Sequence, residues 1–379
     1  MKALLLCISS LLLVVLVLSI VAKESSLCSH ALSENVISIT NNRVSVSFDL
    51  RKGQLSYMAG ERRLIDGAYC AALVNGEERL STQFTWDSWS RATVTDALGL
   101  GSSLVITSTA REGIRLTLEI TLYDGKEYAV LEETIANMGQ RPVRVDQLKP
   151  LAVAANGKFL AGISPRRAVL FLNSYSTVGY RGVVPMLPVP CIAIPGSLPD
   201  GTGNLRLGDY SGWWVQVIWN EDNSLGFLSG ALTANKWKTW IDVHRDLMSR
   251  RFSDWSVNNQ GRAILLAGQV FRSEKIMIGT CNDPLVCLDE YGLAIRKINQ
   301  VQSVPPSLGW CSWPYYYRKI TEADILRNAS FMKDKLSPAY RYVLIDSGWF
   351  TLRGDWQANE KFPEGMKATA DKIHALGLE

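Results

Sequence analysis

Two short clusters in the last quarter of the sequence hold the residue types best suited to binding a ligand. The first is Trp310, Ser312 and Trp313, followed by a Pro-Tyr-Tyr-Tyr run, and the second is Asp346-Ser347-Gly348-Trp349. A flat aromatic face suits the apolar C–H face of a sugar ring, while a carboxylate accepts hydrogen bonds from its hydroxyls. The clusters therefore indicate carbohydrate binding, with ordinary core packing as the competing interpretation of their Trp and Tyr residues.

The elements around these clusters predict a parallel α/β arrangement. Residues 308–313 and 342–346 are short and apolar, as expected of buried strands, and residues 321–336 and 366–376 have the spacing of helices. Thr321 and Asp324 suit a capping box at the first of these helices. Strand, helix, strand and helix in this order indicate βαβ units, in which ligands bind at the carboxyl ends of the strands. Asp346 closes an apolar strand, which is a costly place for a charge without a partner.

The region before these elements predicts a different fold. Residues 35–280 contain many short segments of alternating apolar and polar residues, for example 44–48 and 115–122, with turn signals such as Asn75-Gly76 and Asp124-Gly125 between them. We expect a large antiparallel β-sandwich here. Residues 283–306 then predict a linker helix, capped by Asp283 with Pro284 in its first turn, and a stiff proline connector. The following part, 307–379, holds the βα units.

The first 22 residues predict export. One lysine precedes an apolar run that ends in a small residue, Ala22, which is typical of a signal peptide. The run is also about 20 residues long, enough to cross a bilayer, so an uncleaved N-terminal anchor is the alternative. Both interpretations place the protein outside the cytoplasm, either secreted or anchored to a membrane.

Charge and composition argue against several other classes. The formal net charge of +4 on 379 residues, without a Lys/Arg-rich run, does not favour nucleic-acid binding. The seven cysteines form no CxxC pair and the three histidines are far apart, so neither a metal site nor a histidine-based triad is predicted. Outside the cytoplasm some cysteines can pair, for example Cys281 with Cys287, and buried free thiols are the alternative.

Several blocks along the last 70 residues resemble a known family. They are Gly309-Trp310-Cys311-Ser312-Trp313, Ile320-Thr321-Glu322, Val343-Leu344-Ile345-Asp346-Ser347-Gly348-Trp349, Gly354-Asp355-Trp356, Lys361-Phe362-Pro363-x-Gly365 and His374-Ala375-Leu376-Gly377. Their order and spacing resemble the opening of the catalytic barrel in microbial α-galactosidases of the α-galactosidase/raffinose-synthase clan, the melibiase-like glycoside hydrolases. The preceding β-rich region resembles the N-terminal sandwich of that family in general character.

The resemblance implies a fold and an activity. It implies a β-sandwich followed by the start of a (β/α)8 barrel, truncated after the second βα unit, in an enzyme that removes terminal α-linked galactose with retention of configuration. Such enzymes act on oligosaccharides and other glycosides, use two carboxylates about 5–5.5 Å apart and need no cofactor or metal. A galactosyl-transferring relative and a non-catalytic carbohydrate-binding protein are the alternatives.

The resemblance also implies roles for four residues. Trp313 takes the position of the ring that stacks near the sugar, and Asp346 that of the first carboxylate in the Asp-Asp-Gly-Trp motif that binds galactose hydroxyls. Trp349 closes this motif, Ser347 replaces its second Asp, and all four residues are expected to bind the substrate. Loss of a charge-assisted contact weakens hydroxyl recognition by about 1–3 kcal/mol, so we expect an altered sugar preference or weak galactosidase activity. The catalytic carboxylates of the family are expected beyond Glu379, and the chain alone is expected to be inactive.

Overall fold

The computed structural model describes residues 26–153, 157–160, 168–173, 182–185, 208–220, 222, 224–246, 251–336 and 338–379. The chain divides into two compact units, which meet in sequence at Val301 and Gln302. The predicted signal peptide or anchor, residues 1–22, lies outside the described residues. None of the helices within the described ranges is long and apolar enough to span a membrane.

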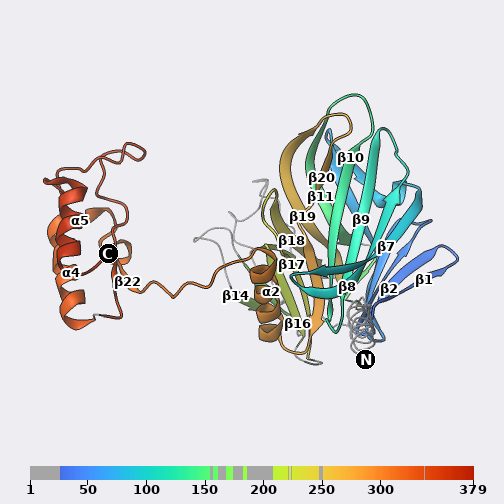
Figure 1. Ribbon diagram of the computed structural model, residues 1–379, viewed down its shortest axis with the longest axis horizontal. Coiled ribbons are helices and arrows are strands. Elements are labelled where there is room, and N and C mark those ends of the chain that lie inside the picture. Colours follow the sequence, from blue (N-terminus) through green and yellow to red (C-terminus); the bar gives the residue numbers. More distant parts are fainter. Residues whose placement is uncertain are drawn as a thin grey trace, which may run out of the picture. The chain divides into compact units, whose positions relative to one another are not determined.

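The first unit is built on two antiparallel sheets (Figure 1). The strands of the first sheet are Ser29–Ser33 (β1), Val36–Thr40 (β2), Val44–Asp49 (β3), Gln54–Ala59 (β4), Arg62–Val74 (β5), Glu77–Leu80 (β6), Val143–Val153 (β11), Lys158–Phe159 (β12), Asp209–Trp213 (β15), Lys238–Arg245 (β18) and Phe252–Leu265 (β19). Their order is β1-β2-β3-β4-β5-β11-β19-β18-β15, with β6 and β12 paired to β5.

The second sheet is also antiparallel. Its strands are Trp86–Asp96 (β7), Gly99–Ser108 (β8), Ile114–Tyr123 (β9), Tyr128–Asn137 (β10), Ala168–Leu172 (β13), Gly182–Pro185 (β14), Val215–Asn220 (β16), Leu225–Ala231 (β17), Val270–Arg272 (β20) and Ile276–Cys281 (β21). Their order is β14-β13-β16-β17-β21-β10-β9-β8-β7, with β20 paired to β10. Neighbouring strands in sequence are mostly neighbours in the sheets, as expected where short turns join them.

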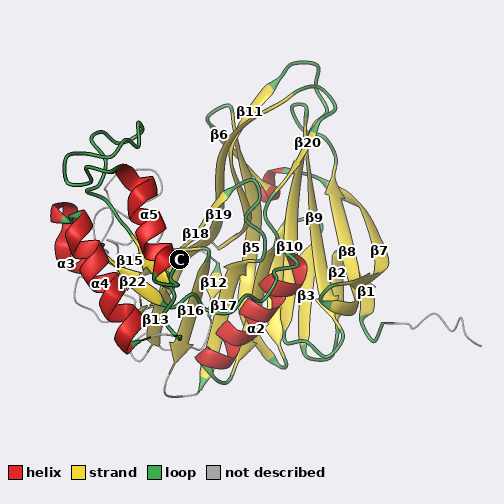
Figure 2. Cartoon of the chain, turned by 60° about the vertical axis from the view of Figure 1, so that its left-hand side comes forward, coloured by secondary structure: helices red, strands yellow, loops and turns green. Residues whose placement is uncertain are grey.

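Alternating side chains from both sheets form one apolar core. The strands of these sheets are drawn in yellow in Figure 2. In β3, Val44, Val46 and Phe48 are buried while the residues between them are partly exposed. Burial of each such side chain contributes about 1.5–3 kcal/mol, and the strand period of two directs them all to one side. The predicted turn at Asn75-Gly76 has positive φ at both residues, 52° and 85°, as a tight hairpin requires. The expected β-sandwich is confirmed.

One helix, Pro284–Ile298 (α2), covers part of the second sheet. The predicted cap is confirmed, because the Asp283 carboxylate accepts a hydrogen bond from the Leu285 N–H (2.8 Å) and Pro284 stands in the first turn. Of the two alternatives for the cysteines, Cys281 and Cys287 are found paired in a disulfide, which joins the end of β21 to α2. Cys28, Cys70 and Cys311 are free thiols among the described cysteines.

The second unit contains a parallel pair of strands, Gly309–Cys311 (β22) and Tyr342–Leu344 (β23). Its helices are Trp313–Tyr316 (α3), Glu322–Lys335 (α4) and Gly365–Ala375 (α5), with a 3-10 turn at Tyr317–Lys319 (Figure 2). The predicted capping box is confirmed, since the Thr321 hydroxyl and the Asp324 carboxylate each accept a hydrogen bond from the other residue's backbone N–H.

Two expectations for this unit were wrong in detail. Residue 313 was expected in a strand, but Trp313 begins α3, because Pro314 follows it and favours the first turn of a helix. The strand 342–346 was expected to be buried, yet Tyr342 and Leu344 are 37% and 57% exposed. Only Val343 and Ile345, which alternate with them, pack on the core beneath α4 and α5.

Candidate functional site

The two predicted clusters lie on the segments that follow β22 and β23, except for Trp310, which lies within β22 and packs on the core of this unit, and Ser312 joins the two segments. Ser312 is fully buried. Its backbone N–H donates to the Leu344 carbonyl (3.1 Å), and its hydroxyl oxygen accepts a hydrogen bond from the backbone N–H of Asp346 (2.9 Å). The parallel register places Cys311 opposite Leu344, so the segments that follow the two strands begin at the same edge of the strand pair. Trp313 and Asp346 therefore follow neighbouring strand ends, as predicted.

Asp346 is half-buried beyond the end of β23. Its Oδ1 accepts a hydrogen bond from the backbone N–H of Ser347 at 2.5 Å. This local bond, together with the Ser312 contact to the Asp346 backbone, fixes the carboxylate while leaving Oδ2 as a further acceptor. A carboxylate held in this way is suited to accept hydrogen bonds from ligand hydroxyls.

The loop after Asp346 is held by a glycine and an asparagine. Gly348 has φ of 118°, and a Cβ there would stand 2.8 Å from the backbone of Arg318, so only glycine fits. The Asn359 side chain donates to the carbonyls of Gly348 (2.9 Å) and Phe350 (3.3 Å), and its backbone N–H donates to the Trp349 carbonyl (2.8 Å). The backbone on either side of Trp349 is therefore held by contacts from outside its own motif.

Aromatic rings are concentrated around both segments. Trp313 is 36% exposed, and its ring lies 5.3 Å from that of Tyr317 in an edge arrangement. Trp349 stacks on Trp356 with ring centroids 6.0 Å apart and also contacts the ring of Phe350. An exposed ring and a carboxylate at neighbouring strand ends provide both the apolar and the polar contacts that a sugar needs.

Tyr317 has an uncommon backbone conformation, with φ of 50° and ψ of −132°. For a bulky residue this conformation costs about 1–3 kcal/mol and is concentrated at ligand-binding sites. It turns the chain from α3 toward Arg318, whose carbonyl accepts a hydrogen bond from the Lys361 ammonium group at 2.6 Å. The segment that carries Trp313 is thus hydrogen-bonded to the loop whose conformation Asn359 fixes.

The structure adds Asn359, which the sequence did not single out, and gives a further role to Tyr317 of the Pro-Tyr-Tyr-Tyr run. Both residues shape the loops that carry the predicted residues, but these roles have no local signal, because they depend on partners 9 to 11 residues away or on backbone strain. Asn359 stands two residues before the Lys361-Phe362-Pro363 block, and that proximity was the one available hint.

Comparison with known sequences gives a local similarity. No family model matches the chain. The α-galactosidase of Oryza sativa is 39% identical over 85 residues, which are 20% of this chain and 19% of that protein. A probable α-galactosidase of Dictyostelium discoideum is 34% identical over 96 residues, 23% of this chain and 25% of that protein. The similarity therefore covers about a fifth to a quarter of these curated relatives.

Comparison with solved structures gives a similarity of fold over most of the chain. The GH36 α-galactosidase AgaA from Geobacillus stearothermophilus, in complex with 1-deoxygalactonojirimycin, aligns with a TM-score of 0.59 and 13% identity over 91% of this chain and 55% of that one. The α-galactosidase from Lactobacillus brevis aligns with a TM-score of 0.54 and 13% identity over 94% of this chain and 54% of that one. This chain spans about half the length of these structures and is similar to α-galactosidases in local sequence and in fold.

Proposed function

We propose that this chain is part of a retaining glycoside hydrolase that cleaves terminal α-linked galactose. The observation that carries the proposal is the junction at Ser312, which brings an exposed tryptophan and a fixed carboxylate to neighbouring ends of two parallel strands. The local similarity to α-galactosidases supports the same substrate class. A related AgaA variant was solved in complex with stachyose, which supports an oligosaccharide substrate.

In this proposal β22 and β23 are the first two strands of a (β/α)8 barrel, and the residues at their carboxyl ends bind the sugar. Trp313 stacks on the apolar face of the galactose ring, and Asp346 accepts hydrogen bonds from its hydroxyls. Ser347 supplies an uncharged hydroxyl where the Asp-Asp-Gly-Trp motif of the resembling family has a second carboxylate, and Trp349 adds an aromatic surface to the sugar site. Asp346 acts as a binding group and not as the nucleophile.

The reaction in such an enzyme proceeds through a covalent glycosyl intermediate formed by a carboxylate on the anomeric carbon. A second carboxylic acid protonates the leaving oxygen and later takes a proton from water. We assign neither of these two groups to a residue of this chain, and we therefore expect the 379-residue chain by itself to show no turnover. We place the protein outside the cytoplasm, because its first 22 residues have the pattern of an export signal or anchor.

The test is to assay the complete product of the gene that encodes this chain on an aryl α-galactoside, with the matching α-glucoside as control. We expect release of galactose, and we expect Asp346→Asn to lower kcat/KM by about 10- to 100-fold, since a hydrogen bond to a charged group contributes about 1.5–3 kcal/mol. Asp371→Asn, an exposed carboxylate on α5, is the control and should leave activity unchanged. Activity restricted to the α-glucoside, or an unaffected Asp346 variant, would overturn the proposal.

A further inference from the structure

A hairpin in the segment that follows β23 presents an exposed aromatic ring. Residues 350–358 form this hairpin, which is closed by an antiparallel bridge between Phe350 and Ala358. Its turn carries Trp356, which is 57% exposed. Because the hairpin comes after Asp346 in the same segment, it lies beyond the strand end at which the candidate sugar site stands.

The ring of Trp356 is held from one side. It stacks on the ring of Trp349, with centroids 6.0 Å apart and an angle of 28° between the planes, and it meets the ring of Phe350 in an edge arrangement at 5.1 Å. Trp349 in turn packs on the core of the second unit. Since Trp349 covers one side of the Trp356 ring, the exposed area lies away from Trp349, where the apolar face of a ligand can stack on it.

The backbone of the turn has a conformation that a bulky residue rarely adopts. Trp356 has φ of 53°, in the left-handed region. The Asp355 carboxylate accepts hydrogen bonds from the backbone N–H groups of Leu352 (3.4 Å) and Gln357 (3.3 Å). The Thr351 N–H donates to the Gln357 carbonyl (3.0 Å). Strained residues of this kind are concentrated at ligand-binding sites, and a turn that is fixed in advance lowers the entropy cost of binding.

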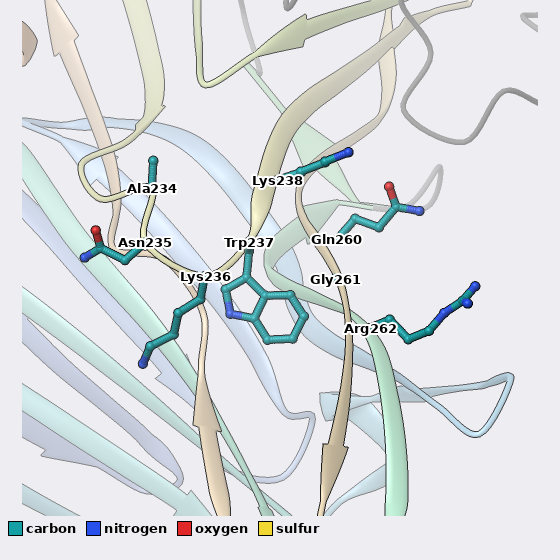
Figure 3. Close-up of a pocket in the computed structure, with 8 residues that line it drawn as sticks. All are labelled: Ala234, Asn235, Lys236, Trp237, Lys238, Gln260, Gly261 and Arg262. Atoms are coloured by element: carbon teal, nitrogen blue, oxygen red, sulfur yellow. The ribbon is translucent and has the colours of Figure 1, made fainter. Parts of the chain in front are cut away.

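A pocket in the sandwich shows the opposite arrangement of its tryptophan. This pocket of about 460 Å³ is lined by residues 234–238 and 260–262 (Figure 3). Its tryptophan, Trp237, is 6% exposed, and a Cβ on Gly261, in a β-bulge of β19, would stand 2.6 Å from the Trp237 ring. Because the ring packs against the strand, little of its surface is open to a sugar. Trp356 offers the more accessible aromatic surface.

We propose that Trp356 binds the sugar ring next to galactose in an α-galactoside, the ring that carries the leaving oxygen. This inference rests on the proposed function. A terminal galactose is joined to the rest of the substrate only through its anomeric oxygen, so the part of the substrate that extends beyond Trp313 and Asp346 is the leaving group. The apolar C–H face of a second sugar ring suits the exposed indole, and the exposed Gln357 amide can bond to its hydroxyls.

The experiment compares galactose release by the complete enzyme from melibiose, in which galactose is α-linked to glucose, and from methyl α-galactoside. The methyl group is too small to reach the hairpin, so the ratio of the two kcat/KM values, melibiose over methyl α-galactoside, reports contact with the second ring. We expect Trp356→Ala to lower this ratio about tenfold, the effect of losing the burial of one side of an aromatic ring. The loss should appear mainly as a higher KM for melibiose, because binding of the second ring is already present in the ground state.

Three further variants separate the ring from the backbone. Trp356→Gly also removes the ring, but glycine adopts positive φ freely, so this variant should lower the ratio as much as Trp356→Ala does. Trp356→Tyr keeps an aromatic ring, and its ratio should lie between those of the alanine variant and the unmodified enzyme. Trp89→Ala, the matched control, removes a tryptophan that is 39% exposed on β7 of the sandwich, and it should leave the ratio unchanged.

Three results would overturn the inference: an unchanged ratio in Trp356→Ala, a lowered ratio in the alanine variant but not in the glycine variant, or the same loss in Trp89→Ala. In each of these cases the unmodified enzyme still releases galactose, so the proposed function stands while the role of Trp356 fails. If the unmodified enzyme releases no galactose from either substrate, the proposed function fails and this inference fails with it.

Discussion

At the scale of single residues, the buried hydroxyl of Ser312 is the connection between the two strand ends. We predict that Ser312→Ala raises KM more than it lowers kcat in the complete enzyme, because the Asp346 N–H loses its acceptor and the carboxylate loses its fixed position. Leaving this N–H unsatisfied costs about 1–3 kcal/mol. Ser312→Thr keeps the hydroxyl, so its KM should lie closer to that of the unmodified enzyme than the KM of Ser312→Ala does. Equal kinetics for the alanine variant and the unmodified enzyme would exclude a positioning role.

Ser347 is the position at which this sequence departs from the related motif. We predict that Ser347→Asp raises kcat/KM on α-galactosides by about tenfold, because a second carboxylate adds a charge-assisted hydrogen bond to the sugar. Ser347→Asn is the matched control, since it has a similar shape without the charge and should give little gain. If neither variant gains activity, then Ser347 does not determine the sugar preference.

Glu133 in β10 is a carboxyl group inside the sandwich core. It is 0% exposed, and burial raises its pKa well above the ordinary value of about 4.3. The folded state therefore binds this proton more tightly than the unfolded state does. The stabilisation that comes from this bound proton is complete below the ordinary pKa of a glutamate. It is lost as pH rises toward the raised pKa of Glu133 in the folded state.

We therefore predict that Glu133→Gln makes the free energy of unfolding less dependent on pH and raises it at alkaline pH. Urea unfolding at pH 7.5 and 9.0 is the appropriate measurement, because Asp242, whose pKa burial raises to about 6, is almost fully ionised throughout this range. Glu119→Gln, a partly exposed carboxyl on β9, is the control. If the free energy of unfolding changes equally with pH in the unmodified protein and in Glu133→Gln, the raised pKa of Glu133 is contradicted.

At the scale of elements, the docking of α2 on the second sheet depends on a glycine. A Cβ on Gly230 in β17 would stand 2.6 Å from the ring of Tyr291, whose hydroxyl donates to the Ala231 carbonyl (2.6 Å). We predict that Gly230→Ala destabilises the sandwich by about 1–3 kcal/mol through overpacking. Gly292→Ala lies on α2 itself with nothing within 4 Å, and it should stabilise by up to about 1 kcal/mol. Thermal unfolding of both variants checks this, and a neutral Gly230→Ala would refute the packing argument.

The elements also show what the sequence could and could not predict. Alternation and turn residues identified the strands around Val46 and Leu118, and capping residues placed α2 and α4, because these signals are local. The order β5-β11-β19 and the bulge at Gly261 depend on pairings between residues far apart, so no local pattern contains them. The same holds at the candidate site. The position of Asp346 at the end of a predicted strand identified it as a candidate. The hydrogen bond by which Asn359 fixes the loop can be recognised only in the folded chain.

At the scale of the whole molecule, the two units have separate cores. The clusters of buried residues divide between the sandwich with α2 and the strand pair with α4 and α5, and no described residue belongs to both. The residues between them, 301–309, are all exposed. A short exposed connector between two independent cores is the usual construction of domains that unfold separately.

We predict that cutting this connector leaves the sandwich intact. A specific protease site inserted between Ser303 and Val304 should be cleaved in the folded protein, and the free energy of unfolding of the sandwich should change by less than about 1 kcal/mol, because no buried contact is removed. The same site inserted between Asn75 and Gly76, inside a hairpin of the first sheet, is the control, and cleavage there should destabilise the sandwich. The matched comparison is decisive because both cuts break one peptide bond, and only the second interrupts paired strands. A large loss of stability after cutting at Ser303 would mean that the sandwich depends on the unit that follows it.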